Sequence, residues 1–199
     1  MHPSNLRYFL GIGLPEPENS FFAELKRLYH PEKTLSSPPH ITLKPPFLMP
    51  NRSYMLEKLA KVSRYQEPFE LVFDKIGSFK QLKYGTVFLE PETSEKLKQI
   101  EISLSSEIHY LPKTRNFHPH LTLAQRVPHE NLAQVKSELR DLNLKLKLKI
   151  ESLTLYQQEE SGLWLPEKEF RFGESNSHPA HSSRRFQTSL DDDDSPEIH

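Results

Sequence analysis

The sequence predicts a fold of the α+β or α/β class, built from two related lobes. Short apolar runs with a period of two alternate along the chain with amphipathic runs of helical period, which is typical of mixed α and β structure. The order strand, helix, short strand, helix and paired strands occurs twice, which favours two related lobes. Within the 199 residues, we expect one bilobal domain over residues 1–173.

Four helices are predicted where apolar residues recur every three or four positions, and each such face is expected to pack against the core. The residues that share a face are Phe22, Leu25 and Leu28, after a cap at Asn19 or Ser20; Leu56, Leu59 and Val62, after Ser53; Leu97, Ile100, Leu104 and Ile108; and Leu132, Val135 and Leu139.

Strands are predicted at residues 8–14, 40–43, 69–76, 86–90, 120–124, 142–156 and 164–172. Between positions 142 and 150, leucine or isoleucine alternates strictly with asparagine or lysine, which predicts an antiparallel strand with one buried face. The lysine row favours a solvated face or a charged sheet edge over a contact with an RNA backbone.

The composition excludes several classes of protein. With 26 basic and 27 acidic side chains the formal net charge is −1, so any recognition of nucleic acid or phosphate must be local. The chain has no cysteine, which excludes disulfides, thiolate metal sites and cysteine nucleophiles. The first apolar run, residues 8–14, is too short for a signal sequence or a membrane span. We therefore expect a cytoplasmic protein with no membrane partner.

Residues 174–199 are expected to form a disordered acidic tail, because they are rich in Ser, His and Asp and contain almost no residue that could fill a core. The tail holds six acidic residues and two arginines, so residues 1–173 retain 21 acidic and 24 basic residues. The body of the protein is therefore mildly basic.

Two short segments share a pattern that points to chemistry. Residues 39–43 and 119–123 both read Pro-His-Φ-Thr-Φ, where Φ is apolar. Side chains two positions apart leave a strand on the same face, so each His lies beside its Thr while the apolar residues anchor the strand in the core. Repetition with matched flanks favours a functional interpretation over two strand histidines bonded to backbone carbonyls. Two such strands, facing one another, would enclose a small tetrahedral group.

Two imidazoles and two hydroxyls around one phosphate form an acid-base pair with built-in anion donors. Because the unperturbed pKa of histidine is near 6.5, one ring can accept a proton from water while the other donates one to a leaving alkoxide. The threonine hydroxyls can donate hydrogen bonds to the non-bridging oxygens. This chemistry suits the opening of a cyclic phosphodiester without a metal or a covalent intermediate.

The two motifs resemble those of the 2H phosphoesterase superfamily, which includes the 2'-5' RNA ligases and the RNA 2',3'-cyclic phosphodiesterases, and the resemblance covers residues 7–172. It implies a bilobal α+β fold with pseudo-twofold symmetry, in which two mainly antiparallel sheets with flanking helices surround a central cleft and each lobe carries one His-x-Thr motif. It also implies that His40, Thr42, His120 and Thr122 are the catalytic residues, with His40 as proton donor and His120 as proton acceptor.

Residues 115–126 are similar to the superfamily pattern Arg-x-Phe-x-Pro-His-x-Thr-x-x-x-Arg, which makes Arg115, Phe117 and Arg126 candidate substrate-binding residues, together with Lys44. Core packing is an alternative role for Phe117, and exposure to solvent is one for the arginines. After the first motif the chain reads Lys-Pro-Pro-Phe, which is more similar to a bacterial phosphoesterase branch than to the RNA cyclic phosphodiesterases.

The sequence therefore predicts a phosphoesterase that uses no metal or other cofactor and hydrolyses the 2',3'-cyclic phosphodiester of a nucleotide or RNA end, with 2'-5' RNA ligation as the reverse reaction. Its expected partner is that nucleotide or RNA end; we expect a monomer with no obligatory protein partner. Two alternatives stay open. One is a non-catalytic protein that binds nucleotide or RNA phosphate in the same cleft, and the other is a metal-dependent hydrolase that uses His118 and His120.

Overall fold

The computed structural model describes residues 6–29, 36–114 and 116–174. The strands are β1 (Arg7–Gly13), β2 (His40–Leu48), β3 (Phe69–Lys80), β4 (Tyr84–Pro91), β5 (Leu121–Pro128), β6 (Leu146–Ile150), β7 (Ser152–Gln158) and β8 (Trp164–Arg171). The helices are α1 (Glu18–Leu28), α2 (Arg52–Arg64), α3 (Glu95–Glu107) and α4 (Leu132–Asp141). This order confirms the mixed α and β fold, with a helix in each of the expected places.

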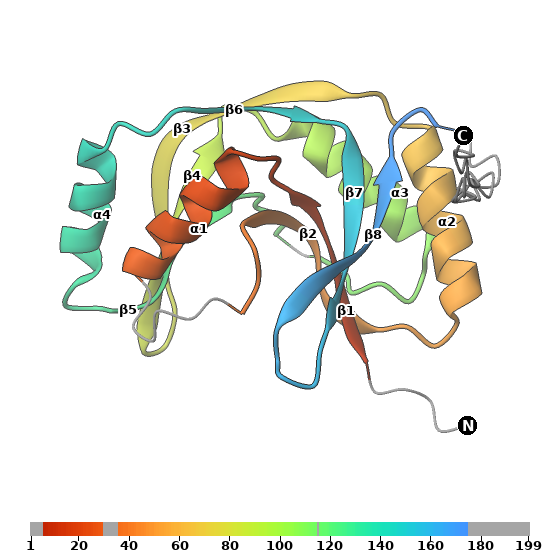
Figure 1. Cartoon of the computed structure of the whole chain (residues 1–199), viewed down its shortest axis with the longest axis horizontal. Coiled ribbons are helices and arrows are strands. Elements are labelled where there is room, and N and C mark those ends of the chain that lie inside the picture. The colour runs from red at the N-terminus through yellow and green to blue at the C-terminus, as the bar shows by residue number, and fades with distance from the viewer. Residues whose placement is uncertain (1–5, 30–35, 115, 175–199) are drawn as a thin grey trace, which may run out of the picture.

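The eight strands form one antiparallel sheet in the order β6-β3-β4-β5-β2-β1-β7-β8, which arches across the molecule (Figure 1). The structure thus has one continuous sheet in place of the two that were expected, and we call its two parts, β6-β3-β4-β5 and β2-β1-β7-β8, the two halves. A single register pair, Ile41 with Leu121, joins β2 to β5. The halves therefore meet at the two strands that carry the His-x-Thr motifs.

One helix from each half packs against a strand of the other half. Helix α1 follows β1 but contacts β5, and helix α3 follows β4 but contacts β2. Helix α2 packs against α3 and β8, whereas α4 packs against β3, β4 and β5. Figure 1 shows the resulting division, with α1 and α4 on one side of the arch and α2 and α3 on the other. This crossed packing holds the two halves around the point where β2 meets β5.

The long strand predicted over residues 142–156 is instead two strands. The chain turns near Asn143, whose φ is 46°, and β6 begins only at Leu146. Strand β6 pairs with β3 at one edge of the sheet, while β7 pairs with β1 in the other half, so the chain passes from one half to the other at Glu151. The leucines of β6 are buried and its lysines exposed, as a charged edge strand requires.

Helix α1 also differs from its prediction. It begins at Glu18, with Pro17 in the capping position, and the Glu16 carboxylate accepts hydrogen bonds from the Asn19 side chain and the Ser20 backbone. The prediction that Leu28 lies on the core-facing side of this helix is wrong. Leu28 is 76% exposed, whereas Lys26 is 3% exposed.

Helix α2 is capped earlier than the sequence suggested. The Asn51 side chain, rather than Ser53, accepts a hydrogen bond at the start of the helix, from the backbone N–H of Tyr54 at 3.0 Å. No helix in the described part of the chain is long and apolar enough to cross a membrane. Apart from Glu174, the expected acidic tail lies outside the described residues, so the tail and the domain boundary stay predictions.

Candidate active site

The four motif side chains lie on one face of the junction between the two halves. The central register pair consists of the apolar residues of the two motifs, which are fully buried on the core side. Antiparallel pairing around it places His40 across from Thr122 and Thr42 across from His120, all on the opposite face and all half-buried. The structure therefore brings together the two motifs that are 80 residues apart in the sequence.

Both imidazole rings are held in the same way. His40 Nδ1 lies 2.8 Å from the Pro38 carbonyl oxygen, and His120 Nδ1 lies 2.7 Å from the His118 carbonyl oxygen. Because a carbonyl only accepts, Nδ1 carries the proton in each ring, and Nε2 of the neutral ring is an acceptor. In the first motif the Thr42 hydroxyl donates to His40 Nε2 at 3.1 Å. A proline separates the two bonded residues in each motif, which keeps the residue that supplies the carbonyl extended.

A β-bulge follows each threonine. On β2, Thr42 and Lys44 pair with adjacent residues of β1, so that Leu43 is an extra residue in the strand. On β5, Leu123 is extra in the same way relative to β4. A bulge reverses the face on which the following side chain lies. The strand therefore presents only its histidine and threonine to the site and turns the next residues into the core.

Lys44 does not reach the site, so its predicted role in substrate binding is wrong. Regular alternation would place it on the same face as His40 and Thr42, but the bulge turns it into the core, where it is fully buried. Its ammonium forms an ion pair with Glu101 and donates to Ser105 Oγ at 2.6 Å and to the Pro112 carbonyl at 3.2 Å. Through these contacts Lys44 links β2 to helix α3.

Aromatic rings surround each histidine. The His40 ring centroid lies 4.5 Å from that of Phe9 on β1 and 5.6 Å from that of Tyr156 on β7, and Trp164 packs on Phe9 at 5.0 Å. Sequence reasoning missed these residues because only the strand register shows which side chains flank the motif.

The second histidine has a similar surround. The His120 ring lies 4.8 Å from Phe88 on β4 and 5.2 Å from Phe79 on β3. His118, whose Nε2 is 3.5 Å from Glu90 Oε1, lies next to the same rings. These walls leave the two Nε2 atoms as polar groups in largely aromatic surroundings.

Burial sets the protonation of both rings. It lowers the pKa of His40 to about 4, against the upward effect of the Pro38 carbonyl, while the charges of Lys26 and His120 lower it further. Burial also lowers the pKa of His120, against the upward effects of the His118 carbonyl bond and the Glu90 carboxylate. Both imidazoles are therefore neutral at pH 7.

We expect this burial to make folding acid-sensitive. Between pH 6.5 and about 4 the unfolded chain binds a proton at His40 that the folded chain does not, so stability falls as the pH decreases through this window. The His40→Asn variant lacks this titration. Thermal unfolding measured from pH 7 to pH 4 should show a shallower decline of the midpoint for the variant than for the wild type, and parallel curves would contradict the assignment.

Three candidate substrate-binding residues remain, namely Phe117, Arg126 and Arg115. Phe117 is half-buried and packs against the core, which supports the core-packing alternative. Arg126 is the extra residue of a further bulge in β5, with a φ of 58°, and its guanidinium lies 5.8 Å above the ring of Tyr84. Arg115 lies outside the described residues. Within the described ranges, no three or more His, Asp or Glu side chains gather where they could hold a metal ion.

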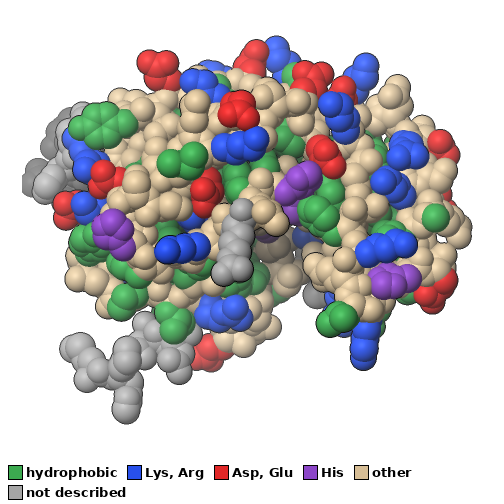
Figure 2. All heavy atoms as spheres, turned by 180° about the vertical axis from the view of Figure 1, so that it is seen from behind, with side chains coloured by type: hydrophobic (Ala, Val, Ile, Leu, Met, Phe, Trp, Pro, Cys, Tyr) green, Lys and Arg blue, Asp and Glu red, His purple; other side chains and the backbone are tan. Residues whose placement is uncertain are grey.

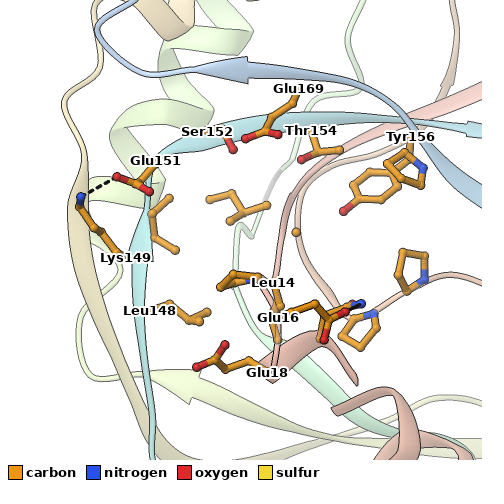
Figure 3. A pocket seen from close by; sticks show the side chains of 18 of the residues that line it. Leu14, Glu16, Glu18, Leu148, Lys149, Glu151, Ser152, Thr154, Tyr156 and Glu169 are labelled. Carbon is orange, nitrogen blue, oxygen red and sulfur yellow. Dashed lines mark hydrogen bonds and ion pairs between the residues drawn. The ribbon is translucent and has the colours of Figure 1, made fainter. Parts of the chain in front are cut away.

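A cavity of about 810 Å³ adjoins the His40 side of the site, with Pro38 and Tyr156 in its wall. Figure 3 shows Glu16 and Glu18 on one side of this cavity and Glu169, on β8, on another, with Lys149 held by Glu151 at its edge. Figure 2 shows the opposite face from Figure 1, where a histidine lies beside a central hollow and charges of both signs are interspersed. The cavity offers room for a group that extends beyond the histidines.

Comparison with known proteins assigns the chain to a family. Residues 14–162 match a sequence model of the 2'-5' RNA ligase superfamily. A Bacillus anthracis protein named "Putative phosphoesterase" is 29% identical over 154 residues, which are 76% of this chain and 88% of the relative, and a Bacillus cereus relative of the same name matches equally.

Solved structures share the fold. The crystal structure of Escherichia coli LigT in apo form has a TM-score of 0.56 and 21% identity, and that of LigT complexed with 3'-AMP has a TM-score of 0.57 and 17% identity. Each covers 84% of this chain and 98% of the LigT chain. Because the family match spans most of the sequence, the chain belongs to the 2'-5' RNA ligase superfamily, the 2H phosphoesterases that its paired His-x-Thr motifs resemble.

Proposed function

We propose that the protein is a phosphoesterase that hydrolyses the 2',3'-cyclic phosphodiester of a nucleotide or RNA end, with His40, Thr42, His120 and Thr122 as its catalytic residues. The observation that carries the proposal is the placement of these four side chains on one face of the β2–β5 junction, with both Nδ1 atoms bound to carbonyls. Such a pair of imidazoles can act as general base and general acid on one phosphate.

In the proposed reaction, one imidazole Nε2 accepts a proton from water as the water oxygen attacks phosphorus. The bond from phosphorus to one ribose oxygen breaks, and the second imidazole, protonated in the presence of the anionic phosphate, donates its proton to that oxygen. The threonine hydroxyls donate to the non-bridging oxygens as negative charge accumulates on them. The product is a ribose phosphomonoester, and the reverse sequence forms a phosphodiester. The roles of His40 as donor and His120 as acceptor stay predictions.

A nucleotide or an RNA end fits the surroundings of the site better than the middle of a long strand. LigT is a nucleotide-binding member of the fold, since it has been crystallised with 3'-AMP. The adjoining cavity of about 810 Å³ has room for a nucleoside. However, the carboxylates of Glu16, Glu18 and Glu169 face it, and they disfavour a run of phosphates there.

The test is turnover of nucleoside 2',3'-cyclic phosphates in the presence of EDTA. We expect the wild type to release the monoester at an unchanged rate after chelation, with a bell-shaped pH profile, and the variant carrying both His40→Ala and His120→Ala to be slower by at least about 10². Tight binding without turnover would instead identify a binding protein. Activity lost on chelation and restored by zinc or manganese would identify the metal-dependent alternative.

A further inference from the structure

Helix α1 carries a lysine, Lys26, whose buried position is unfavourable for the stability of the fold. Lys26 is 3% exposed, beside the core residues Phe22 and Leu25. It makes no hydrogen bond or ion pair with any residue in the described part of the chain. Burial alone lowers the pKa of this ammonium to about 8. A buried charge without a partner is unfavourable for folding, and no described residue offsets the cost in stability of burying Lys26.

The position of Lys26 connects it to the histidine pair. Helix α1 packs against β5, the strand that carries Thr122, and Figure 1 shows the helix beside that strand. The charge of Lys26 is near enough to His40 to lower the pKa of that imidazole. The ammonium therefore lies close to the face on which the two motifs meet.

In the described part of the chain, the rings that pack on the two histidines are aromatic and carry no positive charge for an anionic substrate. Both imidazoles are neutral at pH 7, because burial lowers the pKa of each. The ammonium of Lys44 is bound to Glu101, and the nearest carboxylate on the other side, Glu90, is negative and faces His118. A phosphate held among uncharged donors gains from one ammonium in surroundings that water scarcely enters.

We propose that Lys26 is a substrate-binding residue whose ammonium bonds an oxygen of the phosphate held between His40 and His120. The inference rests on the proposed function, because it takes the same phosphate as its ligand. It gives the buried charge the partner that the described residues do not supply, and it adds to the two motifs a third contact from a different element of the fold.

Phosphate binding can be followed through Trp164, the only tryptophan of the chain, which packs on Phe9 beside His40. Titration with inorganic phosphate at pH 7 should show binding by the wild type and an affinity about 10- to 100-fold lower for Lys26→Met. Lys26→Arg keeps the charge and should stay within about threefold of the wild type. The matched control is Arg27→Met, on the same helix, where the side chain is 46% exposed and pairs with Glu24.

Thermal unfolding distinguishes a binding role of Lys26 from a stabilising one, because the loss of a stabilising lysine would lower the unfolding midpoint. Lys26→Met replaces an unpaired buried charge by an apolar side chain of similar length, so its thermal midpoint should rise, by about 2 to 4 °C. In the wild type, stability should increase between pH 8 and 10.5, where only the unfolded chain holds this proton, and the increase should be smaller in the variant.

Equal phosphate affinity of the wild type and Lys26→Met would overturn the inference, as would an equal loss in Arg27→Met, a lowered midpoint of Lys26→Met, or no phosphate binding by the wild type. The proposed function is judged separately, by turnover of the cyclic nucleotide. Turnover that depends on the histidines but not on Lys26 would support the proposed function and contradict the Lys26 contact. Phosphate binding that depends on Lys26, without turnover, would support the Lys26 contact and contradict the proposed enzymatic function.

Discussion

Replacing either His40 or His120 by alanine should lower kcat for a nucleoside 2',3'-cyclic phosphate by about 10² to 10⁴. In the proposed reaction each imidazole presents Nε2 to the same phosphate, and its Nδ1 bond to a carbonyl fixes the orientation of the ring. Removal of one ring abolishes either the base or the acid, while the threonines still hold the phosphate. We therefore expect the loss mainly in kcat, measured under saturating substrate.

The double variant should be little slower than the slower single variant, because the two rings act on one proton-transfer sequence. His129→Ala is a matched control: this ring also bonds a carbonyl, that of Gln81 at 2.8 Å, but it is exposed and has no place in the proposed site. Unchanged turnover after loss of His40 or His120, or an equal loss after loss of His129, would contradict the acid-base assignment.

The second large effect concerns the buried ion pair of Lys44 and Glu101. Replacing Glu101 by leucine leaves the Lys44 ammonium without its charged partner in a fully buried position, and we expect a loss of about 3 to 5 kcal/mol of unfolding free energy. In the double variant Lys44→Met, Glu101→Leu both charges are gone, and most of the stability should return. Urea unfolding with unchanged m values would measure the cycle.

Helix α3 supplies the control for this cycle. Glu95 pairs with Lys98 on the same helix, but both side chains are largely exposed, so Glu95→Leu should leave the urea midpoint nearly unchanged. The double variant at positions 44 and 101 should also keep its turnover, since Lys44 lies in the core. A stable double variant that had lost turnover would indicate that Lys44 contacts the substrate.

The periodicity of the sequence predicted most of the helices and strands, but it did not predict the features that depend on strand register. The order of helices and strands and the two His-x-Thr motifs followed from spacing alone. The bulge at Leu43, which sends Lys44 into the core, has no signature in the sequence because leucine fits a regular strand equally well. The break at Glu151 coincides with a change of phase, since the apolar residues lie at even positions up to Ile150 and at odd positions from Leu153, on a strand that belongs to the other half.

Lys26 shows a different limit. A helical face read from apolar residues alone includes Leu28 and excludes a lysine, but the buried stripe of α1 passes through position 26, four residues after Phe22. A buried cation can be recognised only when the surrounding structure is known, because nothing in its neighbours along the chain distinguishes it from the exposed Arg27.

The crossed packing of the two halves makes the protein resemble an intertwined dimer within a single polypeptide. Cutting the chain between β3 and β4 would leave β3 in one fragment and its two hydrogen-bonding neighbours in the other, while β7 would be separated from β1. The two His-x-Thr motifs would then lie in different fragments, because β2 precedes the cut and β5 follows it. The proposed site therefore needs both parts of the chain.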